Sequence, residues 1–595
     1  MIRDYFKVLT INLTEKQSSI VEVDGRNEVA GGSGLAALLF NKYGHMDKPW
    51  DDDEQPLIFT IGPLTGYFPL MSKTVCAFKS PYHNQYAESH AGGRSALALR
   101  FADLDAVVIT GKASKPVCIS LGSRRIEIKE VHYLWGMDVY ATGKYLRHMF
   151  RGSGHRSILR IGPAGERGSS MACINADTYR HFGRLGGGAV MGMKNLKGIS
   201  IRGDATFLLP ENKDYPKLFE EVHKQLTDTD MMSKYHDLGT PINVIPLNKL
   251  KALPVRNLQQ TSDPNIAGIS GEKFAEVALL RNNACSGCPV GCIHIGFVRE
   301  RFAKENRYLY RQVAYDHEPI FATGAMLGVL DCFRVLDIID VVERMGIDVM
   351  SSGVALAWAT EAVEKGIISE KETIIPLKFG DAEGYKEAMI HLAMGTNEFY
   401  QTLSKGTMVA AERYNGKDFA CVLGQEMAGY ATGEAFFTSQ ALGFRHSHLD
   451  SSGYSYDQET DEKNAPKAAD FLVKDEQGRV FLTSMLACLF ARGVYNDELL
   501  GKCLNSVGYT DLAGSIPDVS RHIQKLRWRT RFATGFDPRS VTIPKRFTEI
   551  VTWKGAIDVE YLQNLKDEYA RRIIEMGTDD DKKTEEKSED IDTLE

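Results

Sequence analysis

Hydrophobic and polar positions change in short runs through the first two hundred residues, which is the pattern of strands. The segments PLIFTIG (56–62), DAVVITG (105–111) and KPVCISLG (115–122) are rich in residues that favour strands. Gly, Pro and Asn punctuate the runs between them, whereas the helical signal in this part is weak. The pattern therefore predicts a β-rich N-terminal region.

From about Glu211 the period of the hydrophobic positions changes. Val335, Ile338, Ile339 and Val342 follow the i, i+3, i+4, i+7 spacing of one helix face, and Asp331 is placed to cap that helix. We therefore expect the remainder, up to residue 577, to be mostly helical.

The last segment, residues 578–595, contains many charges of both signs and almost nothing to bury. Such a segment cannot offset the entropy lost on ordering. It is predicted to be a disordered, solvated tail, which we favour over an acidic docking segment.

Length and charge narrow the class of protein. A chain of 595 residues exceeds the size of one hydrophobic core, and a net charge of -7 argues against nucleic-acid and membrane-surface partners. No run of about 18 uncharged apolar residues is present. The glycine-rich stretch GRLGGGAVMG (183–192) matches neither nucleotide-binding motif, and no solenoid repeat is evident. We expect a cytoplasmic enzyme with no membrane span and no nucleic-acid partner.

Three cysteines stand close together in one glycine-rich loop. Cys285, Cys288 and Cys292 lie within eight residues, and thiolates at this spacing, with a distant fourth, commonly hold a [4Fe–4S] cluster. Structural zinc is the alternative; we favour it less because no second Cys/His pair with zinc spacing is present, although His294 lies close.

The fourth ligand cannot be chosen by spacing alone. Cys332, Cys488 and Cys503 all remain open. The other cysteines stand singly among apolar neighbours and are expected to behave as small hydrophobic residues, so we assign no chemistry to Cys76, Cys118, Cys173 and Cys421.

Several separate segments resemble one family. From about residue 5 to residue 550 the chain is similar to the tungsten-containing aldehyde:ferredoxin oxidoreductase family. The segments that carry the resemblance are GPLTG (62–66), KSPYHNQYAESHAGG (79–93), IGPAGE (161–166), GRLGGGAVMGMKNLKGISIRG (183–203) and CSGCPVGC (285–292).

The resemblance implies an α+β fold. A β-rich N-terminal pterin-binding domain (1–205) would be followed by two mainly α-helical domains (206–415 and 416–577) that enclose the cofactor. The implied cofactors are tungsten, or less readily molybdenum, held by two pterins; a Mg²⁺ ion that bridges the pterin phosphates; and the [4Fe–4S] cluster.

Two further motifs stand where the family contacts its pterins. ERMGID (343–348) occupies the place of Asp-x-x-Gly-Leu-Asp, and TSMLAC (483–488) the place of Asp-x-x-Gly-Leu-Cys, with Thr and Leu in place of the second motif's Asp and Gly. Gly346 can end one helix and Asp348 can cap the next, which leaves backbone N–H groups for an anionic phosphate. The resemblance implies pterin contacts from Glu343, Gly346, Asp348 and Thr483, and it makes Cys488 the fourth cluster ligand.

The glycine-rich segments supply the other implied pterin contacts. Glycine allows the backbone to approach a ligand closely. His90 stands where the family usually has Asn, and Lys73 where an Arg is common. The implied cofactor-binding residues here are Lys73, Ser89, His90, Gly92, Gly93, Arg184, Gly186 and Gly187.

The implied reaction, in anaerobic metabolism, converts an aldehyde and water into a carboxylic acid. Two electrons would pass singly through the cluster to ferredoxin or to an iron–sulfur electron-transfer subunit. Glu318 and His448 match the family's Glu and His, so we expect Glu318 to be the base and His448 to bind the aldehyde oxygen, with His317 and His446 as second choices.

Two other functions stay open at this point. Some members of the family reduce aromatic-ring thioesters, and the chain could act on a carboxylic acid or thioester instead. A non-catalytic iron–sulfur or zinc scaffold subunit is a candidate of another class. In each case we expect an oligomer or a hetero-complex.

Overall fold

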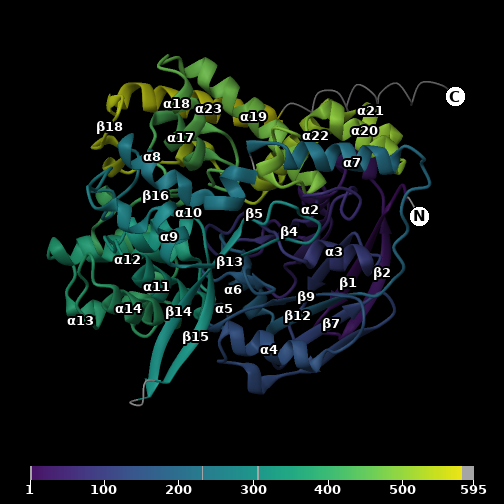
Figure 1. The fold of residues 1–595 in the computed structure, drawn as a ribbon, viewed down its shortest axis with the longest axis horizontal. Coiled ribbons are helices and arrows are strands. Elements are labelled where there is room, and N and C mark those ends of the chain that lie inside the picture. Colours follow the sequence, from purple (N-terminus) through teal and green to yellow (C-terminus); the bar gives the residue numbers. More distant parts are fainter. Residues whose placement is uncertain (1–2, 231, 304–306, 579–595) are drawn as a thin grey trace.

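The N-terminal region of the computed structural model contains two six-stranded sheets (Figure 1). The structure describes residues 3–230, 232–303 and 307–578. The first sheet has the strand order β2-β1-β6-β3-β4-β5. Its strands are β1 (Phe6–Asn12), β2 (Gln17–Val23), β3 (Leu57–Thr60), β4 (Thr74–Lys79), β5 (Tyr86–Ala91) and β6 (Ala106–Thr110).

The second sheet has the order β11-β10-β9-β12-β7-β8, which repeats the first. Strands β1 to β6 correspond in sequence order to β7 to β12, and in each sheet only the pair β1–β6 or β7–β12 is parallel. The chain has therefore built the same sheet twice. The strands are β7 (Val117–Gly122), β8 (Ile126–Glu130), β9 (His155–Arg160), β10 (Ile174–Ala176), β11 (Arg180–Phe182) and β12 (Leu196–Gly203).

Helices also lie in this β-rich region, where the sequence signal for helix is weak. In α2 (Gly32–Tyr43) most side chains are buried on all sides, from Gly32 to Phe40. A helix that is buried all round shows no amphipathic period, which explains the weak signal. The other helices here are α1 (Arg26–Val29), α3 (Ser95–Phe101), α4 (Val139–Met149), α5 (Pro163–Glu166) and α6 (Gly187–Met193).

The rest of the chain is mainly helical. Asp331 caps α11 as predicted, because its carboxylate accepts hydrogen bonds from the N–H groups of Phe333 and Arg334. The main helices are α7 (Tyr215–Thr227), α8 (Val244–Lys249), α9 (Gly271–Val277), α10 (His317–Ile320), α11 (Cys332–Met345), α12 (Val349–Glu364), α14 (Ala382–Met394), α15 (Glu398–Leu403), α16 (Thr407–Tyr414), α17 (Glu434–Leu442), α18 (Gly453–Glu459), α19 (Ala465–Met485), α20 (Asp497–Val507), α22 (Ile516–Ala533) and α23 (Val559–Thr578).

One sheet interrupts the helical region, against the expectation of helix there. Strands β13 (Leu279–Asn283), β14 (Ile293–Ala303) and β15 (Arg307–Tyr315) form an antiparallel sheet that projects from the molecule (Figure 1). The α+β fold class with a β-rich N-terminal region is confirmed. Boundaries near residues 205 and 415 stay a prediction, and the predicted tail (578–595) lies, apart from Thr578, outside the described residues.

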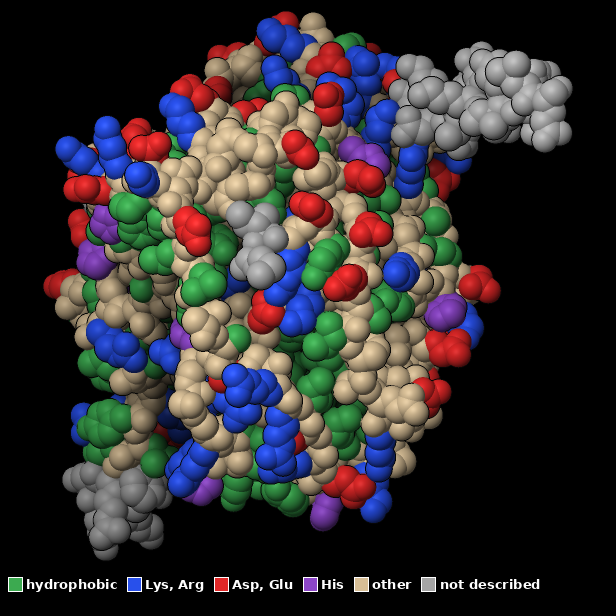
Figure 2. Space-filling view, turned by 90° about the vertical axis from the view of Figure 1, so that its right-hand side faces the viewer, with side chains coloured by type: hydrophobic (Ala, Val, Ile, Leu, Met, Phe, Trp, Pro, Cys, Tyr) green, Lys and Arg blue, Asp and Glu red, His purple; other side chains and the backbone are tan. Residues whose placement is uncertain are grey.

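The sheets and the C-terminal helices share one core. Side chains of α19, α20 and α22 are buried in the same hydrophobic cluster as those of the first sheet, while a second cluster is centred on α11, α12 and α17. Charged side chains of both signs are scattered over the face drawn in Figure 2, among hydrophobic and other residues. Among the described residues, no helix combines the length and apolar character needed to cross a membrane.

Candidate active site

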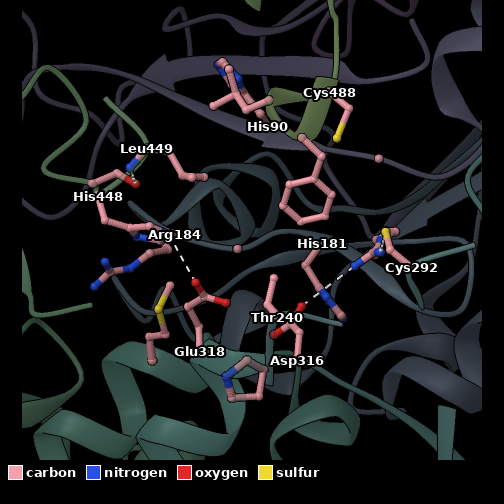
Figure 3. A pocket seen from close by; sticks show the side chains of 18 of the residues that line it. His90, His181, Arg184, Thr240, Cys292, Asp316, Glu318, His448, Leu449 and Cys488 are labelled. Carbon is pink, nitrogen blue, oxygen red and sulfur yellow. Dashed lines mark hydrogen bonds and ion pairs between the residues drawn. The ribbon is translucent and has the colours of Figure 1, made fainter. Parts of the chain in front are cut away.

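A cavity of about 620 Å³ lies where the two sheets meet the helical region. Many of the residues singled out from the sequence line it together, although they come from distant parts of the chain (Figure 3). These are Lys73, Ser89, His90, Gly92, Arg184, Cys285, Cys288, Cys292, Glu318, Glu343, Asp348, His448 and Cys488. Five other predicted residues are not among the lining residues: Gly93, Gly186, Gly187, Gly346 and Thr483.

Four of those five have packing contacts in the structure. A Cβ at Gly186 would lie 2.3 Å from Pro81 Cγ, and one at Gly187 would lie 2.9 Å from Phe78 Cε1. The carbonyl of Gly93 accepts a hydrogen bond from Ser286 N at 3.0 Å. Gly346 is the left-handed residue that ends α11. These glycines do not line the cavity. They allow close packing of the segments behind its lining residues.

The internal repeat of the sheets continues into the helices. Gly162, which follows β9, packs on the end of α11, where an added Cβ would be 2.4 Å from Met345 O. Gly62, which follows the equivalent strand β3, packs on the end of α19, where an added Cβ would also be 2.4 Å from the carbonyl oxygen, that of Met485. The cavity therefore has two half-sites that are built in the same way.

Backbone hydrogen bonds join sheet and helix at matching places in the two half-sites. Cys173 N donates to Gly346 O at 3.1 Å, and Lys73 N donates to Leu486 O at 3.4 Å. Both acceptor residues have left-handed backbones, with φ of 68° at Gly346 and 62° at Leu486. For a leucine this conformation costs about 1–2 kcal/mol. Complete burial of the Leu486 side chain, about 1.5–3 kcal/mol, offsets that cost.

The two half-sites differ in how each places a histidine. In the second, His181 Nε2 lies 2.8 Å from the Glu343 carboxylate. In the first, the equivalent histidine is His90, and Thr483 provides no carboxylate. Instead Ser33 Oγ bridges them, 3.5 Å from His90 Nε2 and 3.1 Å from Thr483 Oγ1. Thr483 therefore does not line the cavity; it contacts His90 only through Ser33.

The carboxylate partner of His90 is Glu88, which lies on the same strand, β5. The Nε2 of His90 lies 3.2 Å from this buried carboxylate, which Arg527 binds through two hydrogen bonds of 2.9 and 3.1 Å. Burial and the charge of Arg445 lower the pKa of His90 to about 4, against the pull of Glu88. His90 is thus neutral at neutral pH.

Arg184 presents a partly unsatisfied guanidinium to the second half-site. Asp348 caps α12 by accepting from Ser351 N at 2.9 Å, and Arg184 Nε lies 3.4 Å from the same carboxylate. Arg184 Nη2 donates to Glu426 O at 2.6 Å, whereas Nη1 has no hydrogen-bond partner among the described residues. A buried donor without a partner is costly, so this group suits an anionic ligand.

The loop cysteines and Cys488 meet at one end of the cavity. Cys488 follows directly after the turn that ends α19, and Cys285 lies against Gly92, where an added Cβ would be 2.7 Å from its sulfur. Cys332 and Cys503 are not among the lining residues. Burial and the neighbouring sulfur of Cys488 raise the pKa of Cys288 to about 12, so a bound cation would be needed to hold the thiolate.

The four thiols are neighbours, because Cys488, Cys285 and Cys292 all contribute, after burial, to the raised pKa of Cys288. Among the described residues, no group of three or more His, Cys, Asp or Glu side chains is arranged to hold a single metal ion. Sulfur atoms are soft donors, which suits an iron–sulfur cluster. Arg180 lies beside them and donates from Nη2 to Cys292 Sγ at 3.8 Å.

Glu318 and His448 form a pair on another side of the cavity, pointing toward one another (Figure 3). His448 Nε2 lies 3.2 Å from Glu318 Oε1, and the hydroxyl of Tyr430 donates to the same oxygen at 3.3 Å. Burial alone would raise the pKa of Glu318, but the hydrogen bond and charge of His448 outweigh it and lower the pKa. His448 Nδ1 has no hydrogen-bond partner among the described residues.

The two second-choice histidines are engaged elsewhere. His317 is buried, and its Nε2 bonds Gly429 O at 3.2 Å. His446 Nδ1 bonds Ala441 O at 2.9 Å, and its Nε2 meets Arg531. Neither is among the lining residues of the cavity. The geometry therefore favours His448 over both.

Sequence reasoning missed several residues that line the cavity, among them Arg180, His181, Asp316 and Tyr430. Asp316 Oδ2 lies 4.0 Å from Arg180 Nη1, so Arg180 links the cysteines to the segment that carries Glu318. Burial and the charge of Glu318 raise the pKa of Asp316. Asp316 precedes Glu318 by two residues, and that proximity was the only available signal.

Comparisons with known proteins identify the family of the chain. The family model "Aldehyde ferredoxin oxidoreductase, N-terminal domain" matches residues 8–203, and the model for domains 2 and 3 of that family matches residues 217–578. A tungsten-containing aldehyde ferredoxin oxidoreductase of Pyrococcus furiosus is 29% identical over 92% of both chains. Its Pyrococcus abyssi counterpart is 31% identical over 71% of this chain and 70% of the relative.

Two further similarities concern other named activities. The WOR-like subunit of an aliphatic sulfonate oxidoreductase of Pyrococcus furiosus is 28% identical over 68% of this chain and 66% of the relative. A solved structure, the active site complex BamBC of benzoyl coenzyme A reductase with 1,5-dienoyl-CoA, has a TM-score of 0.79 at 18% identity and covers 96% of this chain and 94% of that chain. That likeness shows the fold.

Both family models match in order and together span most of the described chain. Cys285, Cys288 and Cys292 lie in the second matched range, and the glycine-rich segments lie in the first. The chain belongs to the aldehyde ferredoxin oxidoreductase family and is an oxidoreductase of the tungsten–pterin type.

Proposed function

We propose that this protein oxidises aldehydes to carboxylic acids and passes the electrons through a [4Fe–4S] cluster to ferredoxin or to an iron–sulfur electron-transfer subunit. One observation carries the proposal. The same cavity has an acid–base pair, Glu318 and His448, on one side and four thiols on another. A proton acceptor and a set of soft metal ligands thus border one cavity.

The residues of the cavity fit the cofactor. Two half-sites of similar backbone construction suit two similar pterins, and the unsatisfied guanidinium of Arg184 together with Lys73 suits their phosphates, whose negative charge Mg²⁺ would help to neutralise. Cys285, Cys288, Cys292 and Cys488 would hold the cluster. When bound, the tungsten centre supplies the two-electron oxidation and the cluster transfers the electrons singly.

Glu318 and His448 handle the proton and the carbonyl. The interaction with His448 keeps Glu318 ionised, so it can accept the proton that water loses as the new carbon–oxygen bond forms. His448 would donate a hydrogen bond to the aldehyde oxygen and polarise the carbonyl. Tyr430 orients Glu318 through its hydroxyl.

The test compares Glu318→Gln and His448→Ala with wild-type protein that carries tungsten and iron. Loss of an acid–base group should lower turnover about a hundred- to ten-thousandfold, with both metals retained. Glu498→Gln is the matched control, because Glu498 is 77% exposed on α20. Aliphatic, aromatic and sugar aldehydes would be screened anaerobically with a viologen dye.

The outcomes separate the candidates. Full activity in both metal-loaded variants would show that the pair is not catalytic. Reduction of benzoyl-CoA without aldehyde oxidation would favour the thioester reductase, the activity named for the structurally similar complex. Zinc as the sole metal in the purified chain would leave a scaffold role.

A further inference from the structure

Arg180 stands between the cysteines and the segment that carries the catalytic base. It is the first residue of β11, and its Nη2 donates to Cys292 Sγ at 3.8 Å. On its other side, Nη1 lies 4.0 Å from Asp316 Oδ2, and Asp316 lies between Glu318 and Cys292 (Figure 3). One guanidinium therefore interacts with a thiol of the proposed cluster site and with a carboxylate of the cavity.

The Asp316 carboxylate is not used to hold the backbone. Asp316 is the N-cap residue of α10, but its side chain makes no cap hydrogen bond. Among the described residues, Arg180 is its ion-pair partner, and no hydrogen bond to its carboxylate oxygens is present. The side chain is 39% exposed and lines the cavity. A carboxylate that is held by one long ion pair can gain or lose a proton without a change in the fold.

Two carboxylates on this segment differ in their affinity for a proton. Burial alone would raise the pKa of Glu318, but its partner His448 lowers it. Burial and the charge of Glu318 raise the pKa of Asp316, against the charge of Arg180. A proton that Glu318 takes up is therefore more stable on Asp316. The charged groups that face Asp316 are Arg180, His181, Glu318 and Glu343.

We propose that Arg180 and Asp316 couple each electron that enters the cysteine-bound cluster to one proton that leaves Glu318. The inference rests on the proposed function, and it adds a proton relay and its link to the cluster. The Arg180 guanidinium is drawn toward the cysteine sulfurs when an electron adds negative charge there, and its hold on the Asp316 carboxylate weakens.

The step conserves charge around Arg180. The O–H bond on Glu318 breaks and an O–H bond forms on Asp316, so one negative charge disappears from Asp316 as one electron arrives at the sulfurs. Aldehyde oxidation supplies both the electron and the proton. When the electron passes on to the acceptor, Arg180 returns to Asp316, which releases its proton to water in the cavity.

This coupling makes the reduction potential of the cluster depend on pH. If reduction raises the pKa of Asp316, protonation of Asp316 must favour reduction by the same factor, because the two equilibria are linked. The potential should therefore be highest at low pH, fall as pH rises between the pKa values of the oxidised and reduced states, and level off beyond them. A nearby charge shifts a pKa by about one unit or more, so the equilibrium constant for reduction should change at least about tenfold across this window.

The test measures the midpoint potential of the cluster at a series of pH values. The purified chain with its metals is titrated with a chemical reductant and followed by electron paramagnetic resonance. In Asp316→Asn the potential should not change across the pH window, and in Asp316→Glu, which keeps a carboxyl group, the pH dependence should remain. Arg180→Gln should lower the potential at every pH, because a cation beside the cluster is lost, and should reduce the pH dependence.

Asp337→Asn is the matched control. Burial raises the pKa of Asp337 as well, but Asp337 lies on α11 and is not among the lining residues of the cavity. This variant should behave as wild type.

Other ionisable groups near the cysteines would also make the potential depend on pH. His155 Nε2 lies 3.3 Å from Ser286 Oγ, and His294 Nδ1 lies 3.2 Å from Cys292 O. An unchanged pH dependence in Asp316→Asn would assign the effect to such histidines and overturn the proposal. A pH-independent potential in wild type, or a full pH dependence in Arg180→Gln, would overturn it too. A chain that holds the cluster but oxidises no aldehyde would refute the proposed function alone, since the potentials would still decide the coupling. A chain without iron would refute both.

Discussion

The substitution Gly92→Ala tests whether Cys285 is held in a position fit for a cluster. A Cβ at Gly92 would lie 2.7 Å from Cys285 Sγ, whereas nonbonded contacts are normally about 3.5–4.0 Å. The sulfur must therefore move by about 1 Å. Gly92 does not have the left-handed backbone found at Gly93, so the added methyl acts through this contact alone.

That displacement is large for a metal ligand, because ligand distances are held within about 0.2 Å. Inserting a methyl group into a tightly packed site costs about 1–3 kcal/mol, which corresponds to cluster binding weakened by about fivefold to a hundredfold. We expect fewer iron atoms and less acid-labile sulfide per chain. The electron paramagnetic resonance signal of the reduced cluster should weaken in proportion.

A matched control separates the contact from a general effect of Gly→Ala. Gly478 lies inside α19, and no atom comes within 4 Å of an added Cβ there. Gly478→Ala should keep all its iron and gain about 1 kcal/mol in helix propensity. Full iron and an unchanged resonance signal in Gly92→Ala would refute the reasoning, because Cys285 would then not occupy the position seen here.

Two further predictions concern ionisable groups. Tyr430→Phe removes a hydrogen bond to the Glu318 carboxylate, so the pKa of that carboxyl should rise, turnover should fall about tenfold, and the acid limb of the kcat/KM profile should move to higher pH. Burial raises the pKa of Glu476 from 4.5 to about 7, so folding becomes less favourable as pH rises through that window. The free energy of unfolding of Glu476→Gln should therefore increase relative to that of wild type between pH 4.5 and 7, by up to about 3 kcal/mol. Thermal unfolding at a series of pH values measures this difference. A pH-independent difference would contradict this.

Local sequence patterns predicted the amphipathic elements, which have one solvent-exposed face and one buried face. Helix α11 was readable because Val335, Ile338, Ile339 and Val342 recur on one buried face behind its cap Asp331. Helix α2 was not, because it is buried all round. The three-stranded sheet β13–β15 was also missed, since its strands flank a cysteine loop and residues of the helical region surround it.

The site shows a similar division. Spacing found the loop of Cys285, Cys288 and Cys292, since a short loop is local. It could not choose Cys488 over Cys503, because the choice depends on where α19 ends relative to the first sheet. Arg180 and Tyr430 reach the cavity from segments with no motif, so only the folded chain identifies them.

The repeat of the two sheets explains why the departures at Thr483 and Leu486 are compatible with a complete site. In the half-site of α11, the helix carries the carboxylate, Glu343, that holds the strand histidine His181. In the half-site of α19, that helix position is Thr483, and the carboxylate has moved to the strand as Glu88.

The two half-sites therefore keep the same pairing of a histidine with a carboxylate, supplied from opposite sides. The Glu88 carboxylate is neutralised by Arg527 on α22, whereas Glu343 has no arginine hydrogen bond among the described residues. Burial and the charge of Arg445 lower the pKa of His90 to about 4, whereas His181 Nε2 has the Glu343 carboxylate as its partner at 2.8 Å. Two chemically identical ligands bound here would meet unlike surroundings, one beside Cys488 and one beside Asp348. The threonine at position 483 adds a second difference, because it places the histidine's carboxylate on the strand in one half-site and on the helix in the other.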